Sequence, residues 1–585
     1  MLKLLKYLSK RNLLQLFFIA VFVVCQVWLE LTMPDYTQQL TKIISTAQAN
    51  GTDINMADVW FNGGMMILCA LGSMVSAFIC GFLSARVAAA LSRNVRKALF
   101  FKVNDFSQKE INDFSTPSLI TRTTNDVVQL QNFFSMGFQL MLKAPIMALW
   151  AILKISTTNM SWTLAAIIAV AIMLLFSIIV IIFGISRFRK IQTLTDELND
   201  RTRENVSGVR VIRAFNAEQY QTKKFESVNS NVYKNNMEVN ILTGMLNPIL
   251  TLVMNGLTLS IFWIGAYLIN DSTSTLERAN LMGEMTAFSS YAMQIVMSFM
   301  MLVFLFIILP RTVVSAKRIN EVLDKEITIK DGKNETLVKG GNIEFKNVSF
   351  SYNGDDKYSL KNLSFEIEKG KTTAIIGPTG SGKTTIVNLL ARLYDTSSGD
   401  ILVDGINVRD YKIDDLENKI SIASQKAMLI KGDIRSNITY GSKGDIDLDK
   451  LNLAINVSQS EFILNDEKGL DKEVSQGGSN FSGGQKQRLS IARALYKDSD
   501  ILVFDDTFSA LDYKTDMLVR KGINENYKDK TVIIIAQRIG TIKNADKIIV
   551  LNEGMVDSIG THESLLETSS LYKEIALSQL EKEEL

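Results

Sequence analysis

Thr373-Ala-Ile-Ile-Gly-Pro-Thr-Gly-Ser-Gly-Lys-Thr-Thr385 sets the architecture of the second half of this chain. An apolar run leads into a glycine-rich turn and a helix start, and residues 377–384 fit the pattern G-x-x-x-x-G-K-[ST]. In this pattern backbone N–H groups wrap phosphate oxygens, the lysine neutralises them and the last hydroxyl reaches Mg²⁺. The segment therefore predicts a nucleotide-phosphate site in an α/β domain. Its candidate binding residues are Gly377, Thr379, Gly380, Ser381, Gly382, Lys383, Thr384 and Thr385, with Thr384 also a candidate metal ligand.

Two further motifs follow this loop. Ile501-Leu-Val-Phe-Asp-Asp506 is an apolar run that ends in two carboxylates. Such a strand holds Mg²⁺ through its first carboxylate, Asp505, and places Asp506 beside it as a candidate general base. Ser482-Gly-Gly-Gln485 opens a basic helical segment and offers N–H groups and a hydroxyl to a second phosphate face.

Composition excludes several classes of protein. The chain has 585 residues, of which 47% are hydrophobic and 21% charged, so it is neither disordered nor collagen-like. A formal net charge of +2 argues against a nucleic-acid partner that is held by a strongly basic surface. Three cysteines in apolar runs and a single histidine, His562, fit neither a disulfide framework nor a typical zinc site.

The first half contains six apolar runs long enough to cross a lipid bilayer, which needs about 20 apolar helical residues. Glu30 in the first run and Lys143 in the third make these two less uniform than the others. The runs cover residues 13–33, 59–85, 137–155, 161–186, 239–270 and 285–310.

Loop charges set the expected orientation. Lys3, Lys6, Lys10 and Arg11 precede the first span, so the amino terminus is expected in the cytoplasm, and six crossings return the second half there. We predict a membrane α-helical domain at residues 1–320, with six spans and long intracellular helical loops. A charged linker at 321–339 and an α/β nucleotide-binding domain at 340–585 follow.

The order of these features resembles a half-size exporter of the ATP-binding cassette (ABC) superfamily: six spans, a phosphate loop, Ser-Gly-Gly-Gln and a carboxylate strand. The resemblance implies ATP and Mg²⁺ as cofactors. It also implies that Tyr352 stacks on adenine and that Gln425 contacts Mg²⁺ and the attacking water. Short helices around 106–111 and 209–219 are expected to press on nucleotide-binding domains. By the same resemblance, Ser482, Gly483, Gly484 and Gln485 contact an ATP held by a partner chain.

Two positions depart from the family pattern. Asp506 stands where active members have a glutamate, and its carboxylate is shorter by about 1.5 Å, a misplacement that can cost about a hundredfold in rate. In Ile533-Ile-Ile-Ala-Gln-Arg538, Gln537 stands where a histidine is expected. An amide can hydrogen-bond a γ-phosphate but cannot carry a proton. The chain is therefore similar to the degenerate-site subunit of heterodimeric bacterial multidrug exporters, with a slow ATP site of its own.

The sequence therefore predicts a transport ATPase that moves hydrophobic or amphipathic compounds out of the cell, working with a second, non-identical half-transporter in the bacterial cytoplasmic membrane. Its Ser482-Gly-Gly-Gln485 segment, the signature motif of the family, is expected to serve the partner's catalytic site. Methionines and phenylalanines in the sixth run suit a cavity for such compounds, or packing. Alternatives are a lipid or peptide exporter, an importer with the exporter fold, and a nucleotide-gated regulator without net transport.

Overall fold

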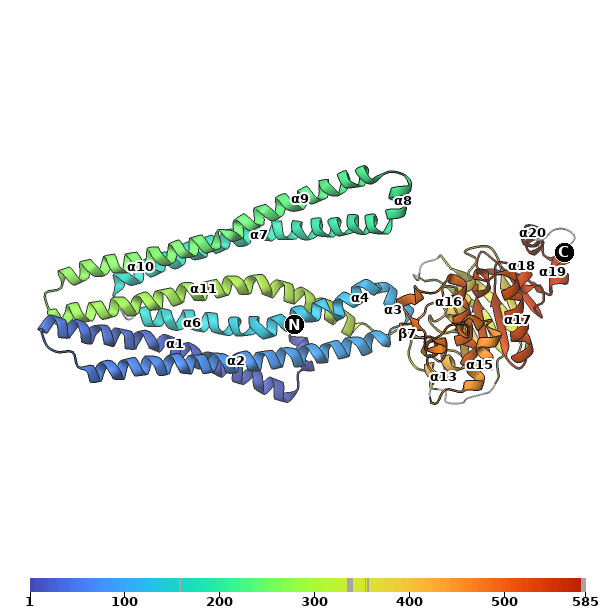
Figure 1. Cartoon of the computed structure of the whole chain (residues 1–585), viewed down its shortest axis with the longest axis horizontal. Helices are drawn as coiled ribbons and strands as arrows, with labels where there is room; N and C mark the ends of the chain where they lie inside the picture. Colours follow the sequence, from blue (N-terminus) through green and yellow to red (C-terminus); the bar gives the residue numbers. More distant parts are fainter. Residues whose placement is uncertain (157–158, 334–339, 353, 355–356, 443, 580–585) are drawn as a thin grey trace. The chain divides into compact units, whose positions relative to one another are not determined.

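The computed structural model describes residues 1–156, 159–333, 340–352, 354, 357–442 and 444–579 (Figure 1). These residues form two compact units. The first comprises Met1–Asn104 and Pro117–Lys325, and the second comprises Asp105–Thr116 and the chain from Glu326 onward. The predicted fold class, a helical membrane domain with an α/β nucleotide-binding domain, is confirmed. Of the predicted linker, residues 334–339 lie outside the described residues.

The first unit consists of long helices. Long helices suit a bilayer because each backbone N–H and C=O must find its partner within the spanning segment. The helices are η1 (Leu2–Tyr7), α1 (Lys10–Asn50), α2 (Met56–Asn104), α4 (Thr116–Thr123), α5 (Asn125–Asn132), η2 (Phe133–Gly137), α6 (Phe138–Ser156), α7 (Met160–Ser207), α8 (Val209–Ala214), α9 (Glu218–Gly244), α10 (Leu246–Asp271) and α11 (Thr275–Asp324).

Five helical segments among the described residues are long and apolar enough to cross a membrane. A shorter apolar segment, Met160–Phe176, begins α7 at the place of the fourth predicted span. Large apolar side chains such as Phe78, Leu153 and Ile182 are exposed along these helices. Water would disfavour so much exposed apolar surface, whereas lipid accommodates it.

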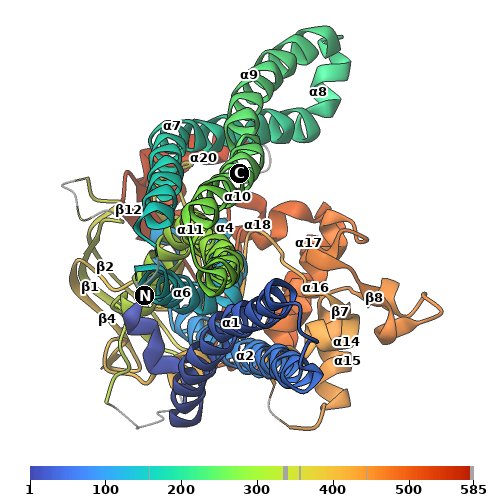
Figure 2. The same cartoon turned by 90° about the vertical axis from the view of Figure 1, so that its left-hand side faces the viewer.

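The helices α7, α8 and α9 form an arm of the first unit (Figures 1 and 2). At its tip the short helix α8 exposes Val211 and is followed by Phe215, which is 79% exposed. This tip falls within the segment 209–219 that the resemblance assigned to contact with a nucleotide-binding domain.

The charges that made two predicted spans less uniform pair with each other. Glu30 Oε1 on α1 lies 2.9 Å from Lys143 Nζ on α6. The same oxygen accepts hydrogen bonds from Gln26 at 2.8 Å and from Ser73 at 3.2 Å. Gln294 on α11 donates to the backbone oxygen of Glu30 at 3.2 Å. These contacts therefore join four helices, α1, α2, α6 and α11, around the paired charges.

A second acid–lysine pair repeats this arrangement. Asp35 Oδ2 on α1 lies 2.6 Å from Lys154 Nζ on α6. Tyr291 on α11 donates its hydroxyl to the other oxygen of Asp35 at 2.5 Å. Three of these helices, α1, α6 and α11, are thus joined at two levels by polar clusters in which an acid pairs with a lysine.

Replacing Lys143 with methionine is expected to destabilise the first unit by roughly 3 kcal/mol, because it leaves the Glu30 carboxylate partly buried without its cation. The midpoint of thermal unfolding in detergent measures the effect. The double variant Glu30→Gln/Lys143→Met should regain most of the loss, and Lys42→Met, at an exposed lysine of α1, serves as the control. An equal loss in the single and the double variant would show that the pair itself contributes nothing.

The second unit has sheets covered by short helices. A six-stranded sheet has the order β12-β11-β3-β10-β9-β6, a four-stranded sheet has the order β2-β1-β4-β5, and β7 pairs with β8. The strands are β1 (Ile343–Phe350), β2 (Leu360–Ile367), β3 (Thr372–Ile376), β4 (Ser398–Val403), β5 (Ile406–Asn407), β6 (Ile420–Ala423), β7 (Gly432–Asp433), β8 (Glu473–Val474), β9 (Ile501–Asp505), β10 (Thr531–Ile535), β11 (Lys547–Asn552) and β12 (Met555–Gly560).

The helices of the second unit surround these sheets. They are α3 (Gln108–Phe114), α12 (Lys383–Leu390), α13 (Ile413–Lys419), α14 (Ile434–Ile438), α15 (Leu448–Val457), η3 (Glu461–Ile463), η4 (Gly469–Asp471), η5 (Gln476–Gly478), α16 (Gly483–Tyr496), η6 (Thr507–Ala510), α17 (Tyr513–Asn526), α18 (Ile539–Ile542), α19 (His562–Thr568) and α20 (Ser570–Leu577).

The parallel register of the large sheet positions the site. Strand β10 lies between β3 and β9, parallel to both, and Ile535 is paired with Ile375 on one side and Asp505 on the other. The β-branched runs of β9 and β10 are buried on both faces, as central parallel strands are. The segments that follow these three strands therefore leave the sheet at one edge, where ligands of open α/β sheets bind.

Candidate nucleotide site

The phosphate loop leaves β3 and enters α12 through left-handed glycines. Gly380 has φ 85° and Gly382 has φ 94°, a backbone region that side chains disfavour. A Cβ on Gly377 would lie 2.2 Å from the backbone oxygen of Leu551, so this position also requires glycine. Lys383 Nζ donates to the backbone oxygens of Gly377 and Pro378, each at 2.8 Å. Burial lowers the pKa of Lys383, against the opposing influence of the nearby carboxylates.

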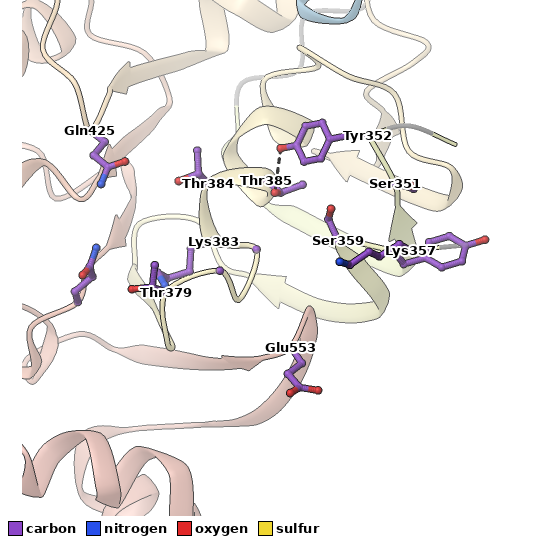
Figure 3. A pocket seen from close by; sticks show the side chains of 14 residues that line it. Ser351, Tyr352, Lys357, Ser359, Thr379, Lys383, Thr384, Thr385, Gln425 and Glu553 are labelled. Carbon is purple, nitrogen blue, oxygen red and sulfur yellow. Dashed lines mark hydrogen bonds between the residues drawn. The ribbon is translucent and has the colours of Figure 1, made fainter. Parts of the chain in front are cut away.

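The loop borders a pocket of ≈ 760 Å³ (Figure 3). In Figure 3, Tyr352 and Thr385 lie together on one side of the pocket and Gln425 lies on the opposite side. Gly377 and Ser381 shape the turn. The residues that line the pocket and that the sequence singled out are Tyr352, Thr379, Gly380, Gly382, Lys383, Thr384, Thr385, Gln425 and Gln537; those it missed are Ser351, Lys357, Tyr358, Ser359 and Glu553, which no motif marks.

Tyr352 is held with its ring in a defined orientation. Its hydroxyl lies 3.1 Å from Thr385 Oγ1, and its ring packs edge-on against Phe350 and Tyr394, with centroid separations of 4.8 and 5.1 Å. The side chain remains 39% exposed. A fixed ring with a free part beside a phosphate loop can stack on a nucleotide base.

Oxygen ligands suited to Mg²⁺ meet beside the loop. Thr384 Oγ1 donates to Asp505 Oδ1 at 3.3 Å, and Asp505 is buried at the end of β9. Burial raises the pKa of Asp505, while the hydrogen bond from Thr384 opposes this shift. In the described part of the chain, no group of three or more His, Cys, Asp or Glu side chains could hold a metal. The Thr384 hydroxyl and the Asp505 carboxylate fit a Mg²⁺ ion that would also take phosphate oxygens from the nucleotide, and Gln425, the third predicted ligand, lines another side of the same pocket.

Asp506 is clamped by two amides. Gln425 Nε2 and Gln537 Nε2 both donate to Asp506 Oδ2, each at 3.0 Å. The two departures from the family pattern thus contact one another, and the sequence could not show this. The lone histidine, His562, hydrogen-bonds Tyr572 at 2.7 Å and is not among the residues that line the pocket.

The Ser-Gly-Gly-Gln motif is built as a helix start that faces outward. The Ser482 hydroxyl accepts from the backbone of Gln485 at 3.3 Å, and the Gln485 side chain accepts from the backbone of Ser482 at 2.9 Å, a capping box for α16. Ser482 and Gly483 are exposed, and Gly484 is half-buried. None of the four lines the pocket of the phosphate loop. The capping box uses the N–H groups of Ser482 and Gln485, and those of Gly483 and Gly484 lie in the first turn of α16, a place where helices can bind anions.

One short helix from the first half belongs to this unit. The sequence predicted a contact helix around 106–111, and the structure has α3 at Gln108–Phe114, capped by Ser107. Glu110 is fully buried; its burial would raise its pKa, but hydrogen bonds from Ser107 and Thr328 lower the pKa overall. Asn112 Nδ2 donates to the hydroxyl of Tyr394 at 3.0 Å.

Comparisons with known proteins agree with this geometry. The ABC transporter transmembrane region matches residues 16–300, and the ABC transporter family matches residues 360–509. The chain is 36% identical over 469 residues to an uncharacterized ABC transporter ATP-binding protein of Mycobacterium tuberculosis, a match that covers 79% of each chain. It is 32% identical to a probable multidrug resistance ABC transporter ATP-binding/permease protein of Bacillus subtilis, with 78% of each covered.

A lipid flippase and a solved structure are also similar to this chain. An ATP-dependent lipid A-core flippase of Mannheimia succiniciproducens is 32% identical, with 79% of this chain and 78% of the flippase covered. Among solved structures, a bacterial Atm1-family ABC exporter with ATP bound has a TM-score of 0.78 at 24% identity, and covers 96% of this chain and 98% of its own. The chain therefore belongs to the ABC transporter family, with a transmembrane region and an ATP-binding domain in the exporter-type fold.

Proposed function

We propose that this chain is the slow-site subunit of an ATP-driven exporter of hydrophobic or amphipathic compounds, and that it works beside a second, non-identical half-transporter. The clamp on Asp506 carries this proposal. Its Oδ2 already accepts two amide hydrogens at 3.0 Å, and neither Gln425 nor Gln537 can take up a proton. An aspartate side chain, shorter than glutamate and already accepting two hydrogen bonds, is a poor base for the attacking water.

The residues of the pocket divide the work of holding ATP. Tyr352 orients the base, the N–H groups of the phosphate loop and Lys383 hold the phosphates, and Thr384 with Asp505 and Gln425 positions the metal. Mg²⁺, when bound, neutralises phosphate charge and polarises the transferred group. The second face of the nucleotide stays open, because the chain's own Ser482 does not line the pocket. A partner's signature motif would close that face, and Ser482 would do the same for the partner's ATP.

The membrane unit supports hydrophobic or amphipathic cargo. Along α11, Met293 and Met297 are exposed, whereas Phe288 is fully buried against Trp162 at a centroid distance of 5.7 Å. Flexible thioethers adapt to many apolar shapes, so the two methionines can contribute to a cavity while Phe288 packs the bundle. Relatives named for multidrug resistance and for a lipid flippase fit the same class of cargo. The site of action is the bacterial cytoplasmic membrane, with the amino terminus and the ATP-binding unit inside.

Transport into inside-out vesicles tests this proposal. The chain is produced together with a non-identical half-transporter from the same genome, and ATP-dependent accumulation of ethidium, a hydrophobic cation, is followed by fluorescence. Accumulation is expected with the pair and not with either chain alone. Lys383→Ala removes the cation that neutralises the phosphates in this chain's site and should lower its affinity for ATP.

The results of these assays distinguish an exporter subunit with a slow site from a nucleotide-gated regulator and from a lipid exporter. Brisk ATP hydrolysis by this chain alone in nanodiscs would overturn the slow-site heterodimer. The Asp506 clamp also favours a second candidate, a nucleotide-gated regulator, which would change conformation with ATP yet accumulate neither ethidium nor a fluorescent phospholipid when the partner is present. Accumulation of the phospholipid alone would make the cargo a lipid.

A further inference from the structure

The turn that follows the phosphate-loop helix contacts two segments that lead toward the membrane unit. Helix α12 ends at Leu390, and Tyr394 lies four residues later with 8% of its surface exposed. We propose that Tyr394 is a positioning residue that transmits the seating of the ATP base on Tyr352 to helix α3. This inference rests on the proposed binding of ATP and names how that site is coupled.

The first step runs from the pocket to the turn through aromatic rings. Tyr352 lines the pocket, and its ring meets the ring of Tyr394 at 90° with 5.1 Å between centroids. Phe350 packs against both rings, at 4.8 Å from Tyr352 and 5.5 Å from Tyr394. Three aromatic rings in contact leave little free volume, so a base that fixes Tyr352 also restricts Tyr394.

The second step runs from the turn to α3 through one hydrogen bond. The hydroxyl of Tyr394 accepts from Asn112 Nδ2 at 3.0 Å. Helix α3 is a short rigid body, because Ser107 and Glu110 form its capping box and Phe106 stacks on Phe114 at 6.0 Å. A restraint on Asn112 is therefore a restraint on the whole helix.

The turn itself is stiff enough to transmit this restraint. Leu393 N donates to the backbone oxygen of Asn388 at 2.8 Å, and Arg392 N donates to that of Leu389 at 3.0 Å. These backbone hydrogen bonds hold the turn to the end of α12. The Arg392 side chain donates to the backbone oxygen of Lys330 at 2.8 Å. The turn thus contacts the segment after α11 through the Arg392 side chain and α3 through the Tyr394 side chain.

The linker and α3 are also joined directly. Glu110 Oε1 accepts from Thr328 Oγ1 at 2.7 Å, and the side chain of Glu110 is fully buried. The segments that follow α2 and α11 are consequently held together on the second unit. Tyr394 is the residue in this assembly that also contacts a residue lining the pocket, which makes its hydroxyl the place to interrupt the connection.

Hydrogen–deuterium exchange of α3 tests the proposal, with the full chain in nanodiscs. Mg·ATP is expected to slow the exchange of α3 amides, and inorganic tripolyphosphate with Mg²⁺, which has phosphates but no base, is expected to have little effect. Tyr394→Phe removes only the hydroxyl and should abolish the ATP increment, meaning the extra slowing of α3 exchange that ATP causes. This slowing is expected to be about fivefold, the effect of one hydrogen bond. Asn112→Ala should do the same, and the double variant should be no worse than either single variant.

Matched controls remove comparable groups elsewhere in the unit. Tyr496 is 7% exposed and its hydroxyl accepts one hydrogen bond, from the backbone of Asp447, so Tyr496→Phe should leave the increment intact. Asn526 donates to the backbone within its own helix, and Asn526→Ala should likewise have no effect. Binding of a fluorescent ATP analogue is measured in every variant.

Each outcome has a definite meaning. Absence of ATP binding in the unaltered chain would overturn the proposed function itself. Normal binding with an unchanged ATP increment in Tyr394→Phe would overturn the coupling role of Tyr394. Equal loosening of α3 with and without ATP would show that the hydroxyl only packs the helix, and an equal effect of tripolyphosphate would show that the base is not what is transmitted.

Discussion

Replacing Ser482 with alanine should lower ATP turnover of the assembled pair by at least about tenfold, because one lost charge-assisted hydrogen bond to phosphate is worth roughly 1.5–3 kcal/mol. Replacing Asp506 with alanine should change turnover less than about twofold, because under the proposal this carboxylate is an ineffective base. The two residues lie in one chain, yet the proposal assigns them to different ATP molecules. Steady-state phosphate release from the purified pair in nanodiscs measures both.

The cap that Ser482 provides to α16 needs its own control. Alanine at an N-cap costs about 1 kcal/mol of stability by itself. Thr561 caps α19 with an equivalent capping box, so Thr561→Ala reproduces the cap loss away from the nucleotide and should leave turnover nearly unchanged. A larger loss from Asp506→Ala than from Ser482→Ala would reverse the assignment of the two ATP sites.

Restoring the family pattern should accelerate hydrolysis at this chain's own ATP site, which is proposed to be slow. The double variant Asp506→Glu/Gln537→His is expected to raise hydrolysis of the ATP bound to this chain by about a hundredfold, since the longer carboxylate regains its reach and an imidazole can carry a proton. Single-turnover hydrolysis of radiolabelled ATP in the pair measures the step without product release. The partner's own site is silenced in the same experiment by alanine at its catalytic glutamate position.

The two single variants and a double variant without a base serve as controls for this result. Each single change should give only part of the gain, because the two side chains meet at one oxygen of Asp506. Asp506→Asn/Gln537→Asn alters the same positions without supplying a base and should remain slow. An unchanged rate in the double variant with normal ATP binding would place the cause of slowness elsewhere.

Local sequence was sufficient for much of the fold and for part of the site. The phosphate loop is contiguous and its glycines are required by backbone angles, so residues 377–385 could be identified directly. Apolar runs identified the spans because bilayer thickness fixes their length. Glu30 and Lys143 interrupt two of these runs, and their opposite charges are the sequence signal for the ion pair that the structure contains.

Long-range contacts could not be predicted in this way. Asn112 and Tyr394 are 282 positions apart, and neither carries a motif that names the other. The convergence of Gln425 and Gln537 on Asp506 likewise depends on how β6 and β10 align with β9, which the register of a parallel sheet decides. Single-sequence patterns report which face a residue takes, whereas partner choice across a sheet is a property of the assembled fold.

The inclusion of residues 105–116 in the second unit makes that unit discontinuous in the chain. A fragment that starts near residue 326 would lack the segment whose Asn112 contacts Tyr394 and whose Glu110 accepts a hydrogen bond from Thr328. The aromatic side chain of Tyr394 would then be exposed to water. The same division applies when ATP-binding units are exchanged between related transporters. A chimera that replaces only the carboxyl-terminal part would place a foreign α3 against this turn. A chimera that also replaces residues 105–116 would keep the native contacts between α3 and the turn.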